Sequence, residues 1–319
     1  MDINHDDLEI VAACRNKNKL IPSYRGEVRV GDLRDPDYLD RLLVNIDIIC
    51  HTAGWTSFNI NKQNSNQLYL EPTIELINHA IEWRVSRFVN LSSLAAASLS
   101  QRHDPMSAGQ PRSYWPMMNC LIAVEDYMKA HSQIGCSMVN LRPGIFSGQR
   151  MNIGLLPVLI DRLSTVRISY PREPYNHFPL VDGKDIGQAF ARAALAPELE
   201  RYESFNITGP DQPSTSDVIQ FLQQQIPSHK TAFAVPAVIS HYFAWWQELS
   251  KTSQNEVLFS RSLSSLISNP LINIESSKTK LGFDPEISWQ ASLYDLLEDL
   301  QKRSTQVLLS SPAKPLQIE

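Results

Sequence analysis

Residues 46–54 read IDIICHTAG, a short apolar run that ends in three small residues. An apolar run of this length, rich in isoleucine, is typical of a strand that is covered on both faces. Small side chains directly after such a strand let the backbone turn tightly or approach another molecule closely. The stretch therefore predicts a buried parallel strand that ends in a tight turn at Thr52, Ala53 and Gly54.

Four other stretches have the same form, an apolar run followed directly by polar or small residues. They are EIVAACR (9–15), VRVGDL (28–33), RFVNLSS (87–93) and MVNLRPG (138–144). Helical patterns lie between them, such as residues 73–81, and this alternation predicts a parallel sheet covered by helices. We therefore expect an α/β protein with a Rossmann-type doubly wound sheet, in which ligands bind beyond the carboxyl ends of the strands.

The regular alternation weakens after residue 148, where a proline-rich stretch begins. We expect a strand-rich domain over residues 1–148, to which 176–210 return. A smaller, mainly helical lobe should comprise 149–175 and 211–303. The polar tail, 304–319, should be loosely ordered.

The composition of the chain argues against nucleic acid and a lipid bilayer as binding partners. The 319 residues are 43% hydrophobic, and 29 basic against 34 acidic residues give a net charge of -5, so no basic surface for nucleic acid is indicated. The acidic N-terminus has no apolar targeting segment. The longest apolar stretch, 232–246, is shorter than the roughly 20 residues that cross a bilayer. The sequence thus predicts a cytoplasmic protein without a membrane span.

Cysteines and histidines show no metal-ligand spacing. The four cysteines, of which three lie in apolar runs, should be reduced and buried. We expect no metal site. The cysteines are Cys14, Cys50, Cys120 and Cys136.

Taken together, the strand ends resemble the extended short-chain dehydrogenase/reductase family, which includes nicotinamide-dependent epimerases, dehydratases and 3β-hydroxysteroid dehydrogenases. The likeness covers almost the whole chain. It comprises GDLRD (31–35), HTAG (51–54), LSS (91–93), LRPGIFSG (141–148) and SSKTKLGFDP (276–285). Each piece alone is weak, and their order and spacing carry the resemblance.

The resemblance implies a nicotinamide dinucleotide that lies across these strand ends. Arg15 would meet the adenosine ribose, where a basic residue pairs with a 2′-phosphate, so NADP is favoured over NAD. A solvated surface position is the alternative for Arg15. Asp32 would accept from the adenine amino group and Leu33 would pack on the ring. The remaining cofactor-binding positions are Thr52, Ala53, Gly54, Leu91 and Pro143.

Two residues are the catalytic candidates. Ser93 matches the family's serine that hydrogen-bonds the substrate carbonyl, with Ser92 beside it. Tyr114 is the candidate for the family's proton-exchanging tyrosine, although Pro116 indicates a helix start that could point its side chain elsewhere.

The sequence departs from the family where that tyrosine is paired with a lysine four residues later, whose charge lowers the phenol pKa. Four residues after Tyr114 stands Met118. If Glu125 sets the register instead, the two positions hold Met117 and Leu121. The resemblance then implies a binding site without its usual proton donor.

The first strand and its glycine-rich turn, which bring backbone N–H groups onto the pyrophosphate, are also missing. A βαβ unit takes about 30 residues, and only eight precede Glu9. We therefore expect that Met1 is not the natural start.

The expected function is an NAD(P)-dependent oxidoreductase or epimerase/dehydratase that acts on a small carbonyl or hydroxyl compound through an altered site. The alternative is a catalytically inactive relative that binds a nucleotide or serves as a scaffold. Two helical segments, 73–83 and 120–130, stand where relatives pair into a dimer, so a homodimer is expected, with a monomer core as the alternative reading.

Overall fold

The computed structural model forms two compact units. The first comprises Met1–Arg142, Ala189–Asn206 and Ile274–Phe283, and the second comprises Pro143–Gln188, Ile207–Asn273 and Asp284–Glu319. The structure describes residues 8–54, 62–97, 106, 109–112, 115–132, 135–151, 153–165, 169–171, 176–226, 233–235 and 271–310.

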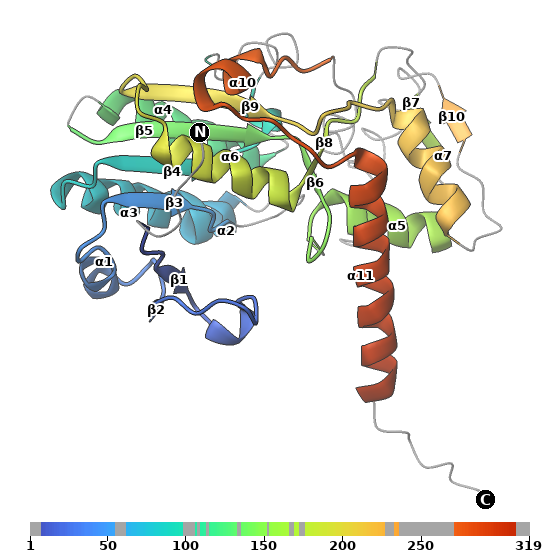
Figure 1. Cartoon of the computed structure of the whole chain (residues 1–319), viewed down its shortest axis with the longest axis horizontal. Helices are drawn as coiled ribbons and strands as arrows, with labels where there is room; N and C mark the ends of the chain where they lie inside the picture. Colours follow the sequence, from blue (N-terminus) through green and yellow to red (C-terminus); the bar gives the residue numbers. More distant parts are fainter. Residues whose placement is uncertain are drawn as a thin grey trace, which may run out of the picture. The chain divides into compact units, whose positions relative to one another are not determined.

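The main sheet has four strands in the order β3-β4-β5-β9, which lie side by side in Figure 1. The strands are β3 (Ile48–His51), β4 (Arg87–Leu91), β5 (Ser137–Pro143) and β9 (Tyr202–Ile207). Neighbours from β3 to β5 are parallel, and the central side chains of Phe88 and Val89 are fully buried. These facts confirm the predicted doubly wound α/β fold.

Buried polar side chains cross this sheet. Asn90 and Asn140 are register partners, and the Asn90 amide nitrogen donates to the Asn140 amide oxygen over 2.9 Å. The Asn140 amide nitrogen lies 3.3 Å from the Ser204 hydroxyl oxygen on β9. A row of side-chain hydrogen bonds therefore joins β4, β5 and β9 through the interior.

A second, separate parallel ladder holds the first two strands. They are β1 (Ala12–Cys14) and β2 (Val28–Val30), joined through the 3₁₀ turn η2 (Lys17–Lys19). Neither strand is hydrogen-bonded into the four-stranded sheet as the structure describes it. The strands expected at residues 9–15 and 28–33 are therefore present, but shorter than their apolar runs.

Helix α1 (Pro36–Leu42) follows β2 and packs close against it. Its cap is Asp35, whose carboxylate accepts from the Asp37 amide. The Tyr38 ring is buried and its hydroxyl donates to the Arg29 carbonyl over 2.8 Å. A Cβ on Gly31 would lie 2.2 Å from a Tyr38 ring carbon, so the close contact requires glycine.

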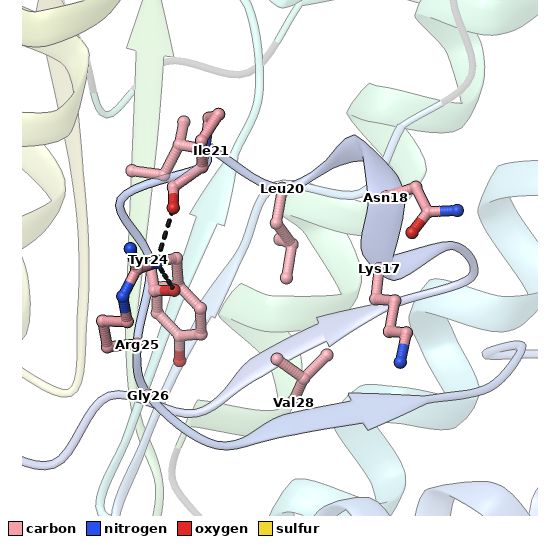
Figure 2. A pocket seen from close by; sticks show the side chains of 9 residues that line it. Lys17, Asn18, Leu20, Ile21, Tyr24, Arg25, Gly26 and Val28 are labelled. Carbon is pink, nitrogen blue, oxygen red and sulfur yellow. Dashed lines mark hydrogen bonds between the residues drawn. The ribbon is translucent and has the colours of Figure 1, made fainter.

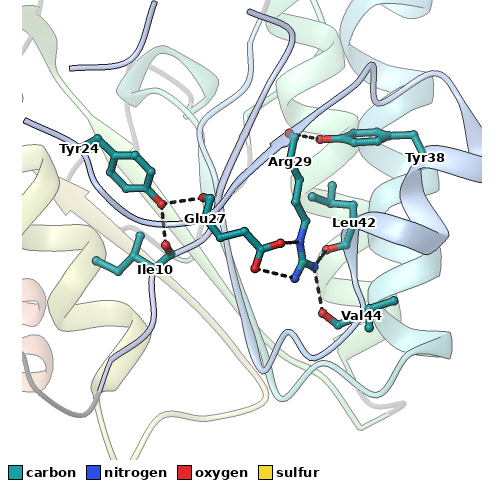
Figure 3. A network of polar contacts seen from close by, with 7 residues as sticks. All are labelled: Ile10, Tyr24, Glu27, Arg29, Tyr38, Leu42 and Val44. Carbon is teal, nitrogen blue, oxygen red and sulfur yellow. Dashed lines mark hydrogen bonds and ion pairs between the residues drawn. The ribbon is translucent and has the colours of Figure 1, made fainter. Parts of the chain in front are cut away.

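Arg29 ties β2 to the end of α1 (Figure 3). Its guanidinium donates to Glu27 over 2.7 Å and to the carbonyls of Leu42 and Val44 over 2.6 and 2.9 Å. Nearby, the Tyr24 hydroxyl lies 2.5 Å from the Ile10 carbonyl oxygen and 2.9 Å from that of Glu27. These contacts hold the short ladder in one arrangement.

The other helices of the first unit pack around the main sheet. Arg87 donates to three carbonyls at the carboxyl end of α6 (Gly183–Leu195), over 2.7 to 3.0 Å. A cation at that end also complements the helix dipole. The helices are α2 (Lys62–Ser65), the π-helical turn η3 (Asn66–Leu70), α3 (Glu71–Glu82), the 3₁₀ turn η4 (Leu94–Ala96), α4 (Pro116–His131) and α10 (Glu275–Leu281).

Where the structure describes it, the second unit shows two short parallel ladders and three longer helices. The ladders are β6 (Ile145–Ser147) with β8 (Leu180–Asp182), and β7 (Ser169–Pro171) with β10 (Phe233–Val235). The helices are α5 (Leu155–Thr165), α7 (Thr215–Gln225) and α11 (Trp289–Ser310). α11 therefore continues past residue 303, where the expected tail begins.

The cysteines differ in burial. Cys120 and Cys136 are buried as predicted, but Cys14 is only half-buried and Cys50 is exposed, so that prediction is wrong for Cys50. In the part of the chain that the structure describes, no helix combines the length and the apolar character that crossing a bilayer requires.

A capping box begins α7. The Ser214 hydroxyl accepts from the Asp217 amide over 3.1 Å, and the Asp217 carboxylate accepts in return from the Ser214 amide over 3.1 Å. We expect Ser214→Ala to lower the free energy of unfolding by about 1 kcal/mol, because the Asp217 amide loses its hydrogen-bond acceptor. Urea denaturation measures the change. Ser216→Ala, two residues later, is the control and should change stability by less than half as much.

Candidate functional site

The carboxyl ends of β1 and β2 bring three predicted residues together. Arg15 directly follows β1 and is exposed, while Asp32 and Leu33 follow β2 and are half-buried. Because β1 and β2 are parallel, their ends meet at the same edge. The charge of Arg15 is the smallest of the causes that lower the pKa of Asp32.

Arg34 holds Asp32 ionised. Its guanidinium donates to both carboxylate oxygens, over 2.9 and 2.7 Å, and its backbone amide donates over 3.0 Å. The Arg34 side chain, and then its backbone amide and charge, lower the pKa of Asp32 to about 2, against a smaller opposing effect of burial. Asp32 is therefore a permanent hydrogen-bond acceptor near neutral pH.

A hollow of about 540 Å³ lies in the connection between β1 and β2 (Figure 2). Two cationic side chains, Lys17 and Arg25, line it. The Arg25 guanidinium donates to the carbonyls of Pro22 and Tyr24 over 2.5 and 3.0 Å. The lining residues are Lys17, Asn18, Leu20, Ile21, Pro22, Tyr24, Arg25, Gly26 and Val28. The surface after Arg15 is therefore basic as well as partly apolar.

The turn after β3 is open. Thr52, Ala53 and Gly54 are all exposed, and a Cβ built on Gly54 would meet no described atom within 4 Å. His51, the last residue of the strand, is buried and its Nε2 lies 3.2 Å from the Thr73 hydroxyl. Packing among the described residues thus leaves the three small side chains accessible for a ligand.

The two serines after β4 have different surroundings. Ser92 is buried and donates to the Glu125 carboxylate. Ser93 is half-buried, and its hydroxyl accepts from the Ala95 amide over 3.2 Å as the cap of η4. Since a hydroxyl that accepts one bond can still donate another, Ser93 is the serine that remains able to contact a ligand. Leu91, at the end of β4, is half-buried.

A buried ion pair that the sequence reasoning missed joins α4 to β5. The Glu125 carboxylate on α4 accepts from the Arg142 guanidinium on β5, with Nε at 3.1 Å from one oxygen and 3.2 Å from the other. Both side chains are 1% exposed. The available signal was a carboxylate in an apolar helix and a guanidinium in an apolar strand, because buried charges require partners.

The amino-terminal half of α4 is apolar where the family resemblance places its acid–base pair. Met117 is 7% exposed, Met118 is 3% exposed and Leu121 is 8% exposed. Their thioether and aliphatic side chains carry no titratable proton. Tyr114 lies outside the described residues.

The remaining predicted residue, Pro143, is buried at the end of β5. The structure therefore groups the candidates at two sets of strand ends. Arg15, Asp32 and Leu33 are at the β1–β2 ladder, and the others that it describes are at β3, β4 and β5. No cluster of three or more potential metal ligands occurs within the described ranges.

Comparison with known proteins assigns the family. The sequence model of the NAD dependent epimerase/dehydratase family matches residues 4–208, which is more than half of the chain. The chain belongs to this family. No curated protein sequence matches it.

Solved structures share the fold at low sequence identity. A Bordetella bronchiseptica enzyme, WbmG in complex with NAD, has 14% identity and a TM-score of 0.66, with 92% of this chain and 86% of that chain covered. UDP-glucose 4-epimerase from Thermotoga maritima with UDP-glucose has 14% identity and a TM-score of 0.67, with 94% and 93% covered. The epimerase Mth375 from Methanothermobacter thermautotrophicus has 14% identity and a TM-score of 0.71, with 95% and 87% covered.

The residues present fit one half of a nicotinamide dinucleotide. An exposed guanidinium, an ionised carboxylate and an apolar side chain at adjoining strand ends match the ribose, the amino group and the flat ring of an adenosine. The sequence holds no Gly-x-Gly-x-x-Gly turn for the pyrophosphate. The described residues therefore offer more binding groups for the adenosine than for the pyrophosphate.

Proposed function

We propose that this chain is an NADP-dependent oxidoreductase or epimerase, with NAD as the alternative cofactor, that acts on a small carbonyl or hydroxyl compound. The observation that carries the proposal is the group of Arg15, ionised Asp32 and Leu33 at the ends of two parallel strands. Membership of the epimerase/dehydratase family supports it. The nicotinamide, when bound, would supply or accept a hydride.

In this proposal the chain's own residues bind and orient the substrate. Ser93 donates a hydrogen bond to the substrate oxygen, and the open turn at Thr52, Ala53 and Gly54 lets the cofactor approach the backbone. Tyr114 is the proposed proton donor. Structural neighbours were solved with UDP-glucose or UDP-glucuronic acid, so nucleotide sugars belong in the first substrate panel.

A second candidate function is a catalytically inactive, nucleotide-binding relative. The buried side chains of Met117, Met118 and Leu121 favour it, because none can replace a lysine that lowers a phenol pKa. Full-length protein separates the two candidates. Nicotinamide fluorescence measures cofactor binding, and absorbance with carbonyl compounds and nucleotide sugars measures turnover. Binding with turnover supports the enzyme, and binding alone supports the inactive relative.

Arg15 should set the choice between the two cofactors. We expect Arg15→Ser to weaken NADPH binding by about tenfold and to leave NADH binding unchanged, because one charge-assisted hydrogen bond to the 2′-phosphate is lost. Fluorescence titration at fixed ionic strength measures both affinities. Arg41→Ser, which removes an exposed guanidinium from α1, is the control. Equal losses for NADPH and NADH in Arg15→Ser would contradict the assignment of Arg15.

We further propose a cytoplasmic homodimer that pairs through α3 and α4. The two helices contact each other within one chain, where the Tyr127 hydroxyl donates to Asn78 over 2.5 Å. Family members that pair through the same helices are the basis of this proposal. Light scattering on the purified chain gives the mass in solution, and a monomer at micromolar concentration would contradict it.

A further inference from the structure

Two rows of buried polar side chains cross one face of the main sheet. The first row runs through register partners: His51 on β3 lies beside Asn90 on β4, and Asn90 lies beside Asn140 on β5. Side chains of register partners project to the same face of a sheet. The hydrogen bond from Asn90 to Asn140 over 2.9 Å fits this placement. Polar groups are thus concentrated on one face, close to the carboxyl ends of the strands.

The second row lies two residues further along the strands. Ser92 follows Asn90 at that spacing, and Arg142 follows Asn140, so both project to the same face as the first row. The Ser92 amide donates to the Leu141 carbonyl over 2.8 Å, which continues the β4–β5 ladder beyond the last residue of β4. Ser92 and Arg142 are buried, like the members of the first row.

Each row is hydrogen-bonded to a helix. The His51 ring nitrogen Nε2 lies 3.2 Å from the Thr73 hydroxyl on α3, and both side chains are buried. The Ser92 hydroxyl donates to the Glu125 carboxylate on α4, which also accepts from Arg142. Hydrogen bonds to an ionised group are stronger than those between neutral groups. Specific polar contacts therefore join the carboxyl ends of β3 and β4 to α3 and α4.

The residues that follow His51 and Ser92 are more accessible. Thr52 is exposed and Ser93 is half-buried. Successive side chains of an extended backbone project to opposite faces, and Ser93 has extended φ and ψ angles of -153° and 147°. Each strand end thus presents one side chain to a helix and the next side chain away from it. A displacement of the buried side chain would therefore displace its accessible neighbour.

Directional contacts explain why polar residues stand in this part of the core. A buried polar group costs free energy unless it is hydrogen-bonded, and apolar residues often replace a buried ion pair without loss of stability. Stability alone therefore does not require these side chains. A hydrogen bond constrains both distance and angle, whereas apolar packing tolerates displacement more readily. Polar contacts at the strand ends can thus fix the places of the residues beside them.

We propose that His51 and Ser92 are positioning residues, which hold Thr52 and Ser93 where these meet the cofactor and the substrate. They act through their hydrogen bonds to α3 and α4, and they do not contact the ligands themselves. These roles rest on the proposed function, because it assigns the ligand contacts to Thr52 and Ser93. The first test is therefore made without any ligand.

Amide hydrogen exchange measures how firmly the end of β4 is held. The amide of residue 92 donates to the Leu141 carbonyl, and the Ala95 amide donates to the Ser93 hydroxyl over 3.2 Å. In Ser92→Ala, both amides should exchange at least about tenfold faster than the change in global stability accounts for, because the strand end loses its bond to α4. The Phe88 amide, in the middle of β4, should change only as global stability does.

The matched control is another buried serine of the first unit. The Ser277 hydroxyl on α10 donates to the Asn206 carbonyl on β9 over 2.5 Å, and β9 carries none of the predicted ligand contacts. Ser277→Ala therefore removes the same chemical group at a distance from the strand ends of β3 and β4. It should leave exchange at residue 92 and Ala95 unchanged once the change in global stability, measured with urea, is taken into account.

The end of β3 is tested through cofactor affinity. His51→Leu and Thr73→Val each remove the bond between the two side chains, so each should weaken NADPH binding by about tenfold. The combined variant should bind no more weakly than either single variant, because the same bond is lost. His51→Gln keeps a group that can bond to Thr73, and it should bind within about threefold of the natural protein. Fluorescence titration near neutral pH measures these affinities.

Two results would overturn the proposed roles. One is exchange at residue 92 and Ala95 that is no faster in Ser92→Ala than in Ser277→Ala, whether or not a cofactor binds. The other is an NADPH affinity that stays unchanged in His51→Leu and Thr73→Val, or losses that add in the combined variant. A natural protein that binds neither NADPH nor NADH would contradict the proposed function alone, and the exchange measurement would then decide on the positioning role.

Discussion

Glu125→Gln should lower the free energy of unfolding by about 3–5 kcal/mol, the largest effect of a single substitution that we expect. The substitution keeps the shape of the side chain but removes the charge that compensates Arg142. A guanidinium that is 1% exposed would then be left without its carboxylate, and the cost of an uncompensated buried charge is of that size. Urea denaturation followed by circular dichroism measures the change.

Two further variants make the Glu125 prediction specific. Lys302→Met breaks an ion pair with Glu298 whose side chains are 67% and 59% exposed, and it should change the free energy of unfolding far less, because solvent screens an exposed pair. The double variant Glu125→Leu/Arg142→Met removes both buried charges and should recover much of the lost stability. If Glu125→Gln cost no more than Lys302→Met, the buried pair would not stabilise the fold.

Acid should destabilise the protein through His51. Burial lowers the pKa of His51 to about 4, so the imidazole stays neutral in the folded state while an unfolded chain takes up its proton near pH 6.5. Its contribution to stability is complete above about pH 6.5 and is lost progressively down to about pH 4. Between pH 6.5 and pH 5 we expect a loss of about 2 kcal/mol from this residue.

Replacement of His51 by a residue that does not titrate tests this prediction. His51→Gln can still hydrogen-bond the Thr73 hydroxyl, and it should have a smaller difference in stability between pH 6.5 and pH 5 than the natural protein. Urea denaturation at the two pH values measures the difference in each form. An identical loss in both forms would assign the acid sensitivity to other groups.

The strands were predictable because their signal is local. The runs that become β3, β4 and β5 are short and mostly apolar, and they end in small or polar side chains, so local composition and length suffice to predict a strand. The runs at β1 and β2 predicted longer strands than the three-residue ones that form. The length of a strand depends on the neighbouring strand with which it pairs. β1 and β2 pair with each other over only three residues.

The site was predictable only in outline. Sequence placed Ser92 and Ser93 at a strand end, but it could not show that Ser92 is bonded to Glu125, 33 residues away. Nor could it show that the Arg34 side chain turns back onto Asp32 and fixes its charge. Such contacts depend on rotamers and on distant segments, which a linear pattern does not contain.

The row formed by Asn90, Asn140 and Ser204 has a consequence for how the molecule assembles. When both faces of two neighbouring strands carry only apolar side chains, a register shift of two residues costs little free energy, because one apolar side chain replaces another in the packing. A register shift here would leave a buried amide without a hydrogen-bond partner, which costs roughly 1–3 kcal/mol for each unpaired group. These three side chains thus favour the native register of β4, β5 and β9 over shifted registers while the chain folds.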